Sequence, residues 1–257
     1  MIFHEVTPGE TLTSIARNYN TTVPALILYN GIPNPDDLAV GQCIVIVYPT
    51  LTHTVQAGDS VYSIAERYGI SVNALYRNNP QLSGSNAQLY PGETIVIRLE
   101  NDYIGSFETG GYTYTDASLS LIESSMPYMN YLMPFTYGFN ENAELTSLDD
   151  EAYIEIAKRY GQKSFLHLST LTPDGFFSGE YAEIVLSDRQ LRERLINNTL
   201  FKMQEKGYDG LDIDFEFIGA ENAMKYAEFI FEARTLLNSY GYEVFAALAP
   251  KTSDDQK

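Results

Sequence analysis

The amino-terminal part of the chain contains one sequence pattern twice, and this repeat restricts the possible folds more than any other feature. His4 and Gly9 of the first copy are matched by His53 and Gly58 of the second, 49 residues later in both cases. A repeat of this length is the size of one supersecondary unit. The sequence therefore predicts two similar small modules in this part of the chain.

Each copy has the hydrophobic pattern of a strand, two helices and a closing strand. In the first copy the helices are expected over residues 11–19 and 23–29, and the closing strand over 42–47. Thr11 and Ser60 stand where a helix N-cap belongs, because a hydroxyl accepts hydrogen bonds from the free N–H groups of the first turn. The expected modules have the order βααβ and cover residues 1–49 and 52–99.

The repeated pattern resembles the lysin motif (LysM), a small module that binds chains of N-acetylglucosamine. The resemblance rests on the turn Pro-Gly-Glu-Thr or Ala-Gly-Asp-Ser, an Asn near the end of the second helix, and Gly-Gln or Gly-Glu before the last strand. It implies a shallow sugar-binding groove between the first turn and the loop after the second helix. The residues that it implies for this groove are Gly9, Glu10, Thr11, Leu12, Asn30, Gly31 and Ile32 in the first copy, and Gly58, Asp59, Ser60, Val61, Asn79 and Pro80 in the second.

The same positions also fit a purely structural role. Gly9 can close a turn and Thr11 can cap a helix without touching a ligand. His4 and His53 are expected at strand edges, and their spacing gives no reason to assign them to a metal.

The stretch from Tyr208 to Glu216 alternates acidic and apolar side chains. In a strand, where side chains alternate between the two faces, Asp212, Asp214 and Glu216 lie on one face. Burying unpaired carboxylates costs several kcal/mol each, so their retention on an apolar strand indicates a use. Crowded carboxylates share protons, which allows the last to act as a general acid while a neighbour stays ionised. The alternative is an edge strand whose polar face contacts water, but helical runs on both sides favour a parallel sheet.

This stretch resembles the Asp-Gly-x-Asp-x-Asp-x-Glu signature of glycoside hydrolase family 18, the chitinase-like enzymes, at Asp209, Gly210, Asp212, Asp214 and Glu216. The resemblance implies substrate-assisted, retaining cleavage, in which the 2-acetamido oxygen of the sugar attacks the anomeric carbon. Glu216 would be the general acid and then the base, Asp214 would orient the acetamido group, and Asp212 would hold charge or a shared proton. Asp209 would fix the entry of the strand, and the mechanism needs no metal and no cofactor.

Other polar residues follow neighbouring strands. Tyr137, Ser169 and Thr170 fall at the ends of the second and third expected strands and are candidates to line the sugar site. The family often has Ser-x-Gly-Gly on the third strand, whereas Ser169-Thr-Leu-Thr lacks both glycines. His167 either faces the barrel interior near the acids or packs against a helix.

From residue 102 onward, short apolar runs alternate with amphipathic helices, which predicts parallel strands with helical crossovers. Such a (β/α)8 TIM barrel carries its reactive groups at the carboxyl ends of its strands and takes about 250 residues. Residues 102–257 number only 156. We therefore expect an α/β chain with a partial barrel domain, truncated after about five strands of a longer protein. The strands are expected over 103–107, 128–137, 164–169, 210–217 and 244–249, and the helices over 117–125, 149–160, 187–206 and 221–240.

Composition restricts the partners. The chain has 34 acidic and 16 basic residues, a net charge of -18 and a pI near 4.4, which opposes binding to nucleic acid or to an anionic membrane surface. Its single cysteine, Cys43, excludes an intramolecular disulfide and is expected to be a small buried residue. Met1-Ile-Phe-His-Glu has neither the charged start nor the apolar run of a secretory signal.

Together these features favour a glycosidase that is anchored by LysM modules on peptidoglycan or another N-acetylglucosamine polymer. The combination resembles spore-germination enzymes that degrade cortex fragments, which implies a location in the spore coat or cortex; without that resemblance the cytoplasm is expected. One alternative is a non-catalytic coat protein that binds peptidoglycan or chitin and does not cleave it, because the barrel is incomplete. Another is a chitinase.

Overall fold

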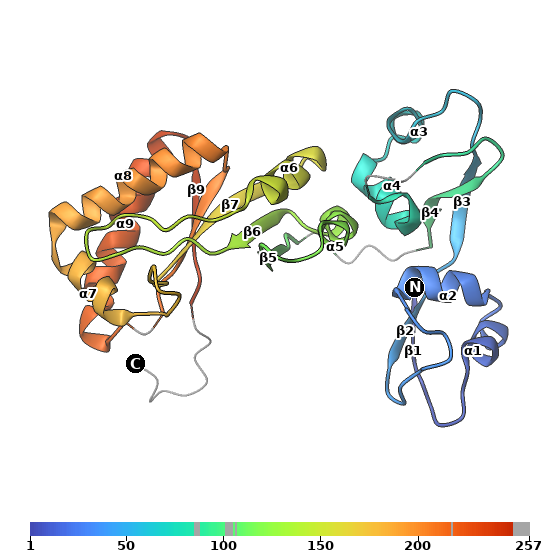
Figure 1. The fold of residues 1–257 in the computed structure, drawn as a ribbon. Coiled ribbons are helices and arrows are strands. Elements are labelled where there is room, and N and C mark those ends of the chain that lie inside the picture. The colour runs from blue at the N-terminus through green and yellow to red at the C-terminus, as the bar shows by residue number, and fades with distance from the viewer. Residues whose placement is uncertain (85–87, 101–104, 106, 217, 249–257) are drawn as a thin grey trace. The chain divides into compact units, whose positions relative to one another are not determined.

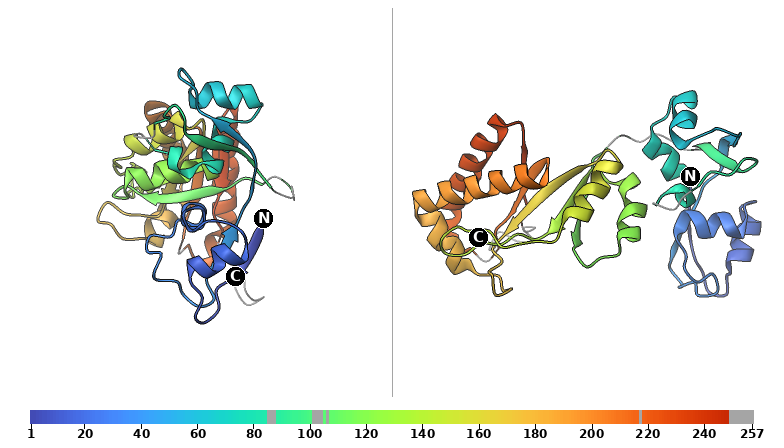
Figure 2. Two further views of the ribbon diagram at one scale, coloured as in Figure 1. Left: turned by 90° about the vertical axis from the view of Figure 1, so that its right-hand side faces the viewer. Right: turned by 45° about the horizontal axis from the view of Figure 1, so that its top comes forward.

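The structure is a computed structural model that describes residues 1–84, 88–100, 105, 107–216 and 218–248. The chain divides into two compact units, Met1–Phe107 and Glu108–Lys257. Figure 1 labels the elements of each unit, and Figure 2 shows the same ribbon from two further directions. No helix in the described part of the chain is both long and apolar enough to cross a membrane.

The first module consists of β1 (Ile2–Glu5), α1 (Leu12–Asn18), α2 (Val23–Asn30) and β2 (Cys43–Ile46). Its two strands pair antiparallel, with Ile2 opposite Ile46. The core lies between this ribbon and the helices, where Ile15, Ile44 and Ile46 are fully buried. Thr11 caps α1 by accepting a hydrogen bond from the backbone of Ser14, which confirms the predicted cap.

The second module repeats this order with β3 (Pro49–Thr54), α3 (Val61–Tyr68), α4 (Val72–Asn78), the short helix η1 (Pro80–Leu82) and β4 (Thr94–Leu99). β3 and β4 pair antiparallel, and Ser60 caps α3 as Thr11 caps α1. β3 begins at Pro49, before residue 52, where the second module was expected to begin.

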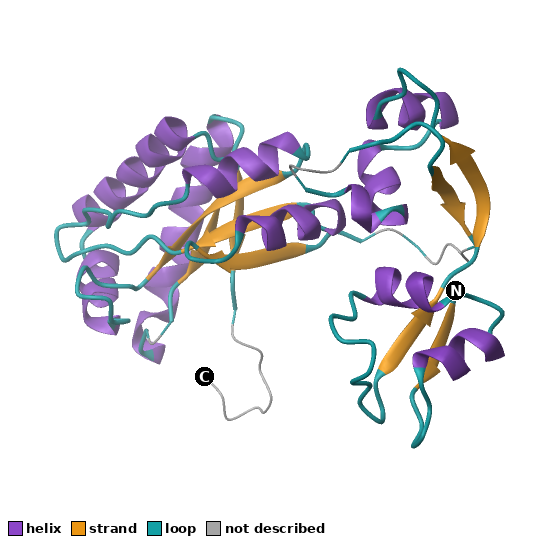
Figure 3. Ribbon diagram, turned by 45° about the vertical axis from the view of Figure 1, so that its right-hand side comes forward, coloured by secondary structure: helices purple, strands orange, loops and turns teal. Residues whose placement is uncertain are grey.

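The second unit alternates strands with helices. Its elements are β5 (Gly110–Tyr114), α5 (Leu119–Ser125), η2 (Met126–Tyr128), β6 (Tyr131–Phe135), α6 (Glu151–Arg159), β7 (Lys163–Ser169), α7 (Gly179–Ser187), α8 (Arg189–Lys206), β8 (Gly210–Asp214), η3 (Ala220–Asn222), α9 (Ala223–Ser239) and β9 (Glu243–Ala246). Within the described residues, five strands form one parallel sheet in the order β5-β6-β7-β8-β9. Figure 3 shows these strands in orange and the helices that pack along them in purple. The expected α/β class and barrel-like parallel sheet are confirmed.

The two faces of this sheet have different surroundings. Leu166, Leu168, Leu211 and Ile213 belong to the main hydrophobic core, which they form with side chains of α7, α8 and α9. The side chains between them alternate to the other, inner face, where the register places His167 beside Asp212. The strand pairing therefore brings a buried histidine and a buried carboxylate together.

Gly210 begins β8 where no side chain fits. A Cβ atom there would lie 2.7 Å from the carbonyl oxygen of Glu243 and 2.7 Å from the ring of Phe165. The glycine of the acidic stretch thus allows close approach of β7 and β9, which is a packing role.

Three expectations differ from the structure. The strand expected over 103–107 falls largely outside the described residues, and the first described strand is β5, farther along the chain. The helix α7 was not expected, because its residues follow a loop rich in turn-forming residues. Cys43 is exposed rather than buried, since it begins β2 on the side away from the core.

Candidate active site

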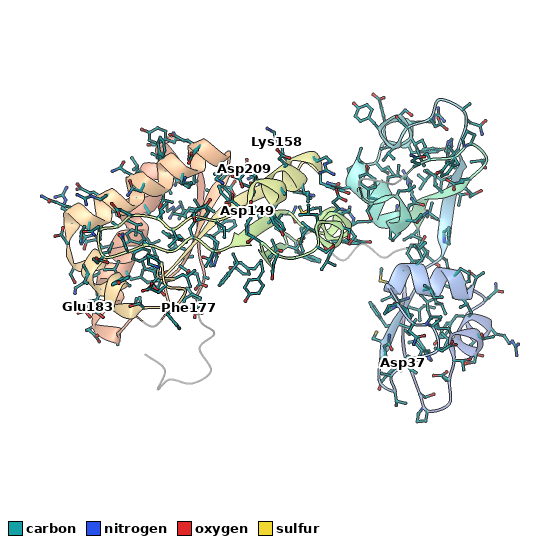
Figure 4. All side chains as sticks on the ribbon, viewed as in Figure 1. Asp37, Asp149, Lys158, Phe177, Glu183 and Asp209 are labelled. Atoms are coloured by element: carbon teal, nitrogen blue, oxygen red, sulfur yellow. The ribbon has the colours of Figure 1, made fainter. Side chains whose placement is uncertain are left out.

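The acidic residues lie at the carboxyl end of β8. Asp212 is only 2% exposed, Asp214 is half-buried, and Glu216 is exposed two residues beyond the end of the strand. Figure 4 shows the opposite ends of this sheet, with Asp209 before β8 and Phe177 in the loop after β7. The acids therefore lie at the end of the strands where a barrel of parallel strands carries its reactive groups.

A cavity of about 390 Å³ opens beside these acids. Asp214 and Glu216 both line it, whereas Asp212 lies beneath it. The remaining lining residues are Tyr112, Thr113, Tyr114, Phe135, His167, Ala247 and Leu248. Glu216 is thus exposed to a hollow that can hold a ligand.

Asp212 accepts a hydrogen bond from a tyrosine on β5, the edge strand of the same sheet. The hydroxyl of Tyr112 donates a hydrogen bond of 2.9 Å to its Oδ2 atom. Burial raises the pKa of Asp212, and the negative charge of Asp214 raises it further, while His167 and Tyr112 oppose the rise. Burial and the nearby Asp212 also raise the pKa of the Tyr112 hydroxyl, so this group stays protonated and remains a donor.

His167 faces the acids, which resolves the alternative that the sequence left open. Its side chain is fully buried, and Nε2 lies 3.5 Å from Oδ2 of Asp214 and 3.8 Å from Oδ2 of Asp212. Nδ1 lies 2.6 Å from the hydroxyl oxygen of Thr136. Nε2 has no hydrogen-bond partner among the residues that the structure describes.

Ser169 and Thr170 support the site from beneath and do not line the cavity. Oγ of Ser169 lies 3.0 Å from the hydroxyl of Thr136 and accepts a hydrogen bond from the backbone N–H of Leu171. The hydroxyl of Thr170 donates a bond of 3.3 Å to the backbone carbonyl of Glu216. Thr170 therefore fixes the backbone at Glu216, whereas Ser169 links Thr136 to the loop after β7.

Tyr137, expected to bind substrate, is not part of the cavity. Its side chain is fully buried, and its hydroxyl donates a hydrogen bond of 2.6 Å to Asp150. The backbone of Tyr137 bridges to Leu168, which belongs to the core on the helix side of the sheet. The assignment is corrected because the side chain points into the core.

Asp209 has the structural role expected of it. Its Oδ2 atom accepts a hydrogen bond of 2.9 Å from the N–H of Ser164, and its own N–H donates to the carbonyl of Ser164. These two bonds join the starts of β7 and β8.

Sequence reasoning missed Tyr112 and Tyr114, which contribute two rings to the cavity. The run Gly-Gly-Tyr-Thr-Tyr at 110–114 was a usable signal, because alternating aromatic and β-branched residues favour a strand. Phe135, Ala247 and Leu248 carry no comparable signal. In the described part of the chain, no group of three or more His, Cys, Asp or Glu side chains is arranged to hold a metal ion.

In the LysM modules, the first turn has the geometry that a glycine permits. Gly9 and Gly58 have φ angles of +85° and +90°. The carboxylate of Glu10 accepts hydrogen bonds from the backbone of Thr7 and from His4, and these bonds lower its pKa, the Thr7 backbone bond most of all. Asp59 is bonded in the same way and its pKa is also lowered.

His4 and His53 connect three elements of their modules. Nδ1 of His4 lies 3.1 Å from the hydroxyl of Tyr19, and Nε2 lies 2.9 Å from Glu10. The corresponding distances in the second module, from His53 to Tyr68 and to Asp59, are 3.0 Å and 2.8 Å. Each histidine thus links its strand to the first turn and to the end of the first helix.

Asn30 and Asn79, expected in the sugar groove, use their amides within the fold. The Nδ2 atom of Asn79 donates to the carbonyls of Leu75 and Val96, and its Oδ1 atom accepts from the N–H of Val96. Asn30 makes the equivalent three bonds in the first module. Because both N–H donors of each amide are occupied, these side chains tie the second helix to the closing strand and have no donor left for a sugar.

The other residues expected in the groove have mixed surroundings. Leu12 and Ile32 are buried in the first module's core, and Val61 packs against the second. Gly31 is exposed and ends α2 in a left-handed conformation.

Comparison with known proteins agrees with this two-part organisation. Residues 4–47 and 53–98 match the LysM domain. A class V chitinase from Pseudomonas fluorescens has a similar fold over 58% of this chain and 47% of its own, with a TM-score of 0.53 and 21% identity. The chain therefore carries two LysM domains and an α/β domain of chitinase-like fold.

The whole chain is also similar to sporulation proteins. It is 30% identical to YdhD of Bacillus subtilis, named as a sporulation-specific glycosylase, and 30% identical to the cortical fragment-lytic enzyme of the same organism. These matches cover 99% and 100% of this chain and 60% of each relative. The crystal structure of the spore cortex-lytic enzyme SleL from Bacillus megaterium superimposes with a TM-score of 0.73 and 27% identity, over 99% of this chain and 60% of that one. The chain thus spans 60% of the length of these relatives.

Proposed function

We propose that this chain belongs to a peptidoglycan-binding glycoside hydrolase that cleaves N-acetylglucosamine linkages in spore cortex or cell wall. The observation that carries the proposal is the shared cavity of Asp214 and Glu216 at the carboxyl end of parallel strands, above the buried Asp212. Similarity along nearly the whole chain to cortical fragment-lytic enzymes supports the choice of substrate.

The proposed chemistry is of the family 18 type. Glu216 donates its proton to the glycosidic oxygen while the 2-acetamido oxygen of the bound sugar attacks the anomeric carbon and breaks the bond to the leaving group. Asp214 orients the acetamido N–H and stabilises the positive oxazolinium ion that forms. Glu216 then takes a proton from water while the water oxygen attacks the anomeric carbon and breaks its bond to the acetamido oxygen. This opens the oxazolinium ring and leaves the anomeric configuration retained.

The raised pKa of Asp212 suits a supporting role in this scheme. Two carboxylates this close cannot both be ionised without a penalty, so a proton held on Asp212 leaves Asp214 free to carry the negative charge. The negative charge on Asp214 then lies next to the positive oxazolinium ion.

The LysM domains hold the catalytic unit on its polymer. Once one domain is bound, later contacts with the same chain form at a high effective concentration, which suits an insoluble substrate. Because the protein has a net charge of -18, its grip on an anionic wall polymer depends on hydrogen bonds and ring contacts. We place the protein at the spore cortex on the strength of its cortex-lytic relatives.

A second candidate is binding without cleavage, and the exposure of the cavity lining favours it. Tyr114 is 67% exposed and Leu248 77% exposed, so water reaches the site freely. A site open to water weakens the electrostatic interactions on which glycosidic cleavage depends.

The experiment that separates the candidates uses isolated cortex fragments. The protein is incubated with them and newly formed reducing N-acetylglucosamine ends are counted, with chitin oligomers in parallel to detect a chitinase. Cleavage is expected from the chain with Glu216, and Glu216→Gln is expected to abolish it while leaving wall binding intact. Glu183→Gln, an exposed carboxylate on α7, is the matched control. Release of ends by Glu216→Gln at the unmutated rate refutes the assignment of the acid, and binding with no release by any version supports the second candidate.

A further inference from the structure

His167 is the buried polar group that the proposed chemistry leaves without a role. It lies on β7 with its side chain fully buried, between the ring of Tyr112 at a centroid distance of 5.1 Å and that of Phe135 at 4.9 Å. Two aromatic contacts restrict the imidazole to one orientation. The ring therefore presents a fixed edge to the acids.

The two nitrogens of this ring have different surroundings. Nδ1 lies 2.6 Å from the hydroxyl of Thr136. Nε2 has no hydrogen-bond partner within the described residues, and its nearest polar neighbours are Oδ2 of Asp214 at 3.5 Å and Oδ2 of Asp212 at 3.8 Å. Both carboxylates come from β8, Tyr112 comes from β5, and Glu216 shares the cavity.

The position of the ring proton follows from these neighbours. A bare Nε2 lone pair would face Oδ2 of Asp214, which carries the negative charge, and Oδ2 of Asp212, which already accepts from Tyr112, so a buried acceptor would stay unpaired. A proton on Nε2 removes both problems, because the N–H then points at two acceptors. In the neutral ring the hydroxyl of Thr136 then donates its one proton to Nδ1 at 2.6 Å, in preference to Oγ of Ser169 at 3.0 Å or the carbonyl oxygen of His167 at 3.2 Å.

We propose that His167 is a positioning residue whose Nε2–H serves as a donor shared by Asp212 and Asp214. The distances of 3.5 and 3.8 Å place Nε2 within one small side-chain rotation of a bond to Asp214. Catalytic hydrogen bonds are commonly longer in the ligand-free state and shorten when substrate binds. The N–H of His167 thus keeps the carboxylate of Asp214 turned toward the imidazole ring. Its contact with Asp212 competes with the hydrogen bond from Tyr112, because both reach the same Oδ2 atom.

The consequence for cleavage rests on the proposed function, whereas the placement of the proton does not. If the carboxylate of Asp214 turns between Asp212 and the bound sugar, the N–H of His167 determines which of the two it faces. His167 lies on β7, the third strand of this sheet, where the sequence has no Ser-x-Gly-Gly run.

The first test needs no substrate. The chain has only three histidines, so nitrogen NMR of the full chain gives three pairs of imidazole signals, and the pair from His167 is identified by its loss in His167→Gln. We expect a protonated Nε2 near neutral pH, and we expect this signal to shift in Asp214→Asn and in Asp212→Asn. Glu243→Gln, which changes a half-buried carboxylate on the neighbouring strand β9, is the control and should leave it in place. A proton on Nδ1 alone, or a signal that ignores both aspartate variants, overturns the proposal.

The second test uses cleavage of cortex fragments. His167→Gln keeps an N–H near the position of Nε2, and His167→Leu removes it with similar bulk. We expect kcat to fall about 100-fold in His167→Leu with KM little changed, and most of this loss to be restored in His167→Gln. Equal losses in the two variants indicate packing alone and refute the positioning role. If the unmutated chain releases no sugar, the proposed function fails, and the NMR signals still decide where the proton lies.

Discussion

The hydroxyl of Tyr112 donates a hydrogen bond of 2.9 Å to Oδ2 of Asp212 and so joins β5 to β8. Because β6 and β7 lie between these strands in the sheet, the bond crosses its inner side. A strand that carries no acid therefore affects the charge of the buried carboxylate.

Tyr112→Phe is expected to raise the pKa of Asp212 further, because the lost hydrogen bond favours the ionised form. If the proposed chemistry holds, cleavage near neutral pH falls about 10-fold, because the carboxyl group of Asp212 loses the hydrogen bond that fixes its position beside Asp214. Carbon NMR of the aspartate carboxyls gives the titration directly. Tyr114→Phe, on the same strand and in the same cavity, is the control; a titration of Asp212 that is identical in both variants contradicts the expectation.

Asp212→Asn is expected to stabilise the second unit by on the order of 1 kcal/mol at neutral pH, because asparagine is neutral by itself, whereas the buried carboxyl must either be ionised or take up a proton on folding. The pKa of Asp212 is higher in the folded state than its ordinary value of 3.8, so the folded protein binds this proton more tightly. Stability of the unmutated protein therefore declines as pH rises from 3.8 through the folded-state value.

The gain in Asp212→Asn should thus shrink as the pH is lowered toward 3.8. Thermal unfolding at several pH values measures it, with the exposed Asp174→Asn as control. A stabilisation by Asp212→Asn that becomes larger as the pH is lowered contradicts this expectation.

Glu10→Gln is expected to lower the unfolding midpoint of the first LysM module at neutral pH. Hydrogen bonds from Thr7 and His4 lower the pKa of Glu10, so its ionised form contributes stability above the ordinary value of 4.5. This contribution is lost as pH falls through the lower, folded-state value, and the two proteins should then unfold alike. Unfolding followed at neutral and acidic pH tests this, with the exposed Glu5→Gln on β1 for comparison; equal midpoints at neutral pH refute it.

Asn79→Ala is expected to destabilise the second LysM module by about 2–3 kcal/mol, because it leaves the part-buried N–H and carbonyl of Val96 and the carbonyl of Leu75 without their Asn79 partner. Urea unfolding measures the loss, and the exposed Asn18→Ala on α1 is the control. Below the unfolding range, affinity for an N-acetylglucosamine oligomer should be unchanged. A large loss of affinity in the folded variant would restore the sugar-binding role that the sequence suggested.

The LysM modules and β8 could be predicted from sequence because their signals are local. Helix caps depend on bonds to residues three positions away, as at Thr11 and Ser60. A positive φ angle favours glycine by itself, as at Gly9 and Gly58. The roles of Asn30 and Asn79 could not be read in this way. Their partners lie on a strand that is distant along the chain.

The polar surroundings of the acids were harder to predict. β7 is buried on both faces from Ser164 to Ser169, so it lacks the alternation that would show which way His167 points. Only the pairing with β8 sets His167 beside Asp212. Tyr137 was misplaced for a related reason, since β6 ends at Phe135 and strand alternation cannot be extended beyond it.

The hydrogen bond from Thr170 to the backbone carbonyl of Glu216 links the loop after β7 to the loop after β8, so the position of Glu216 depends on both loops. A change of length after β7 can displace Glu216 while every letter of the acidic stretch remains. Among sequences that share this stretch, the spacing that follows the third strand is therefore a better guide to a working proton donor than the stretch itself.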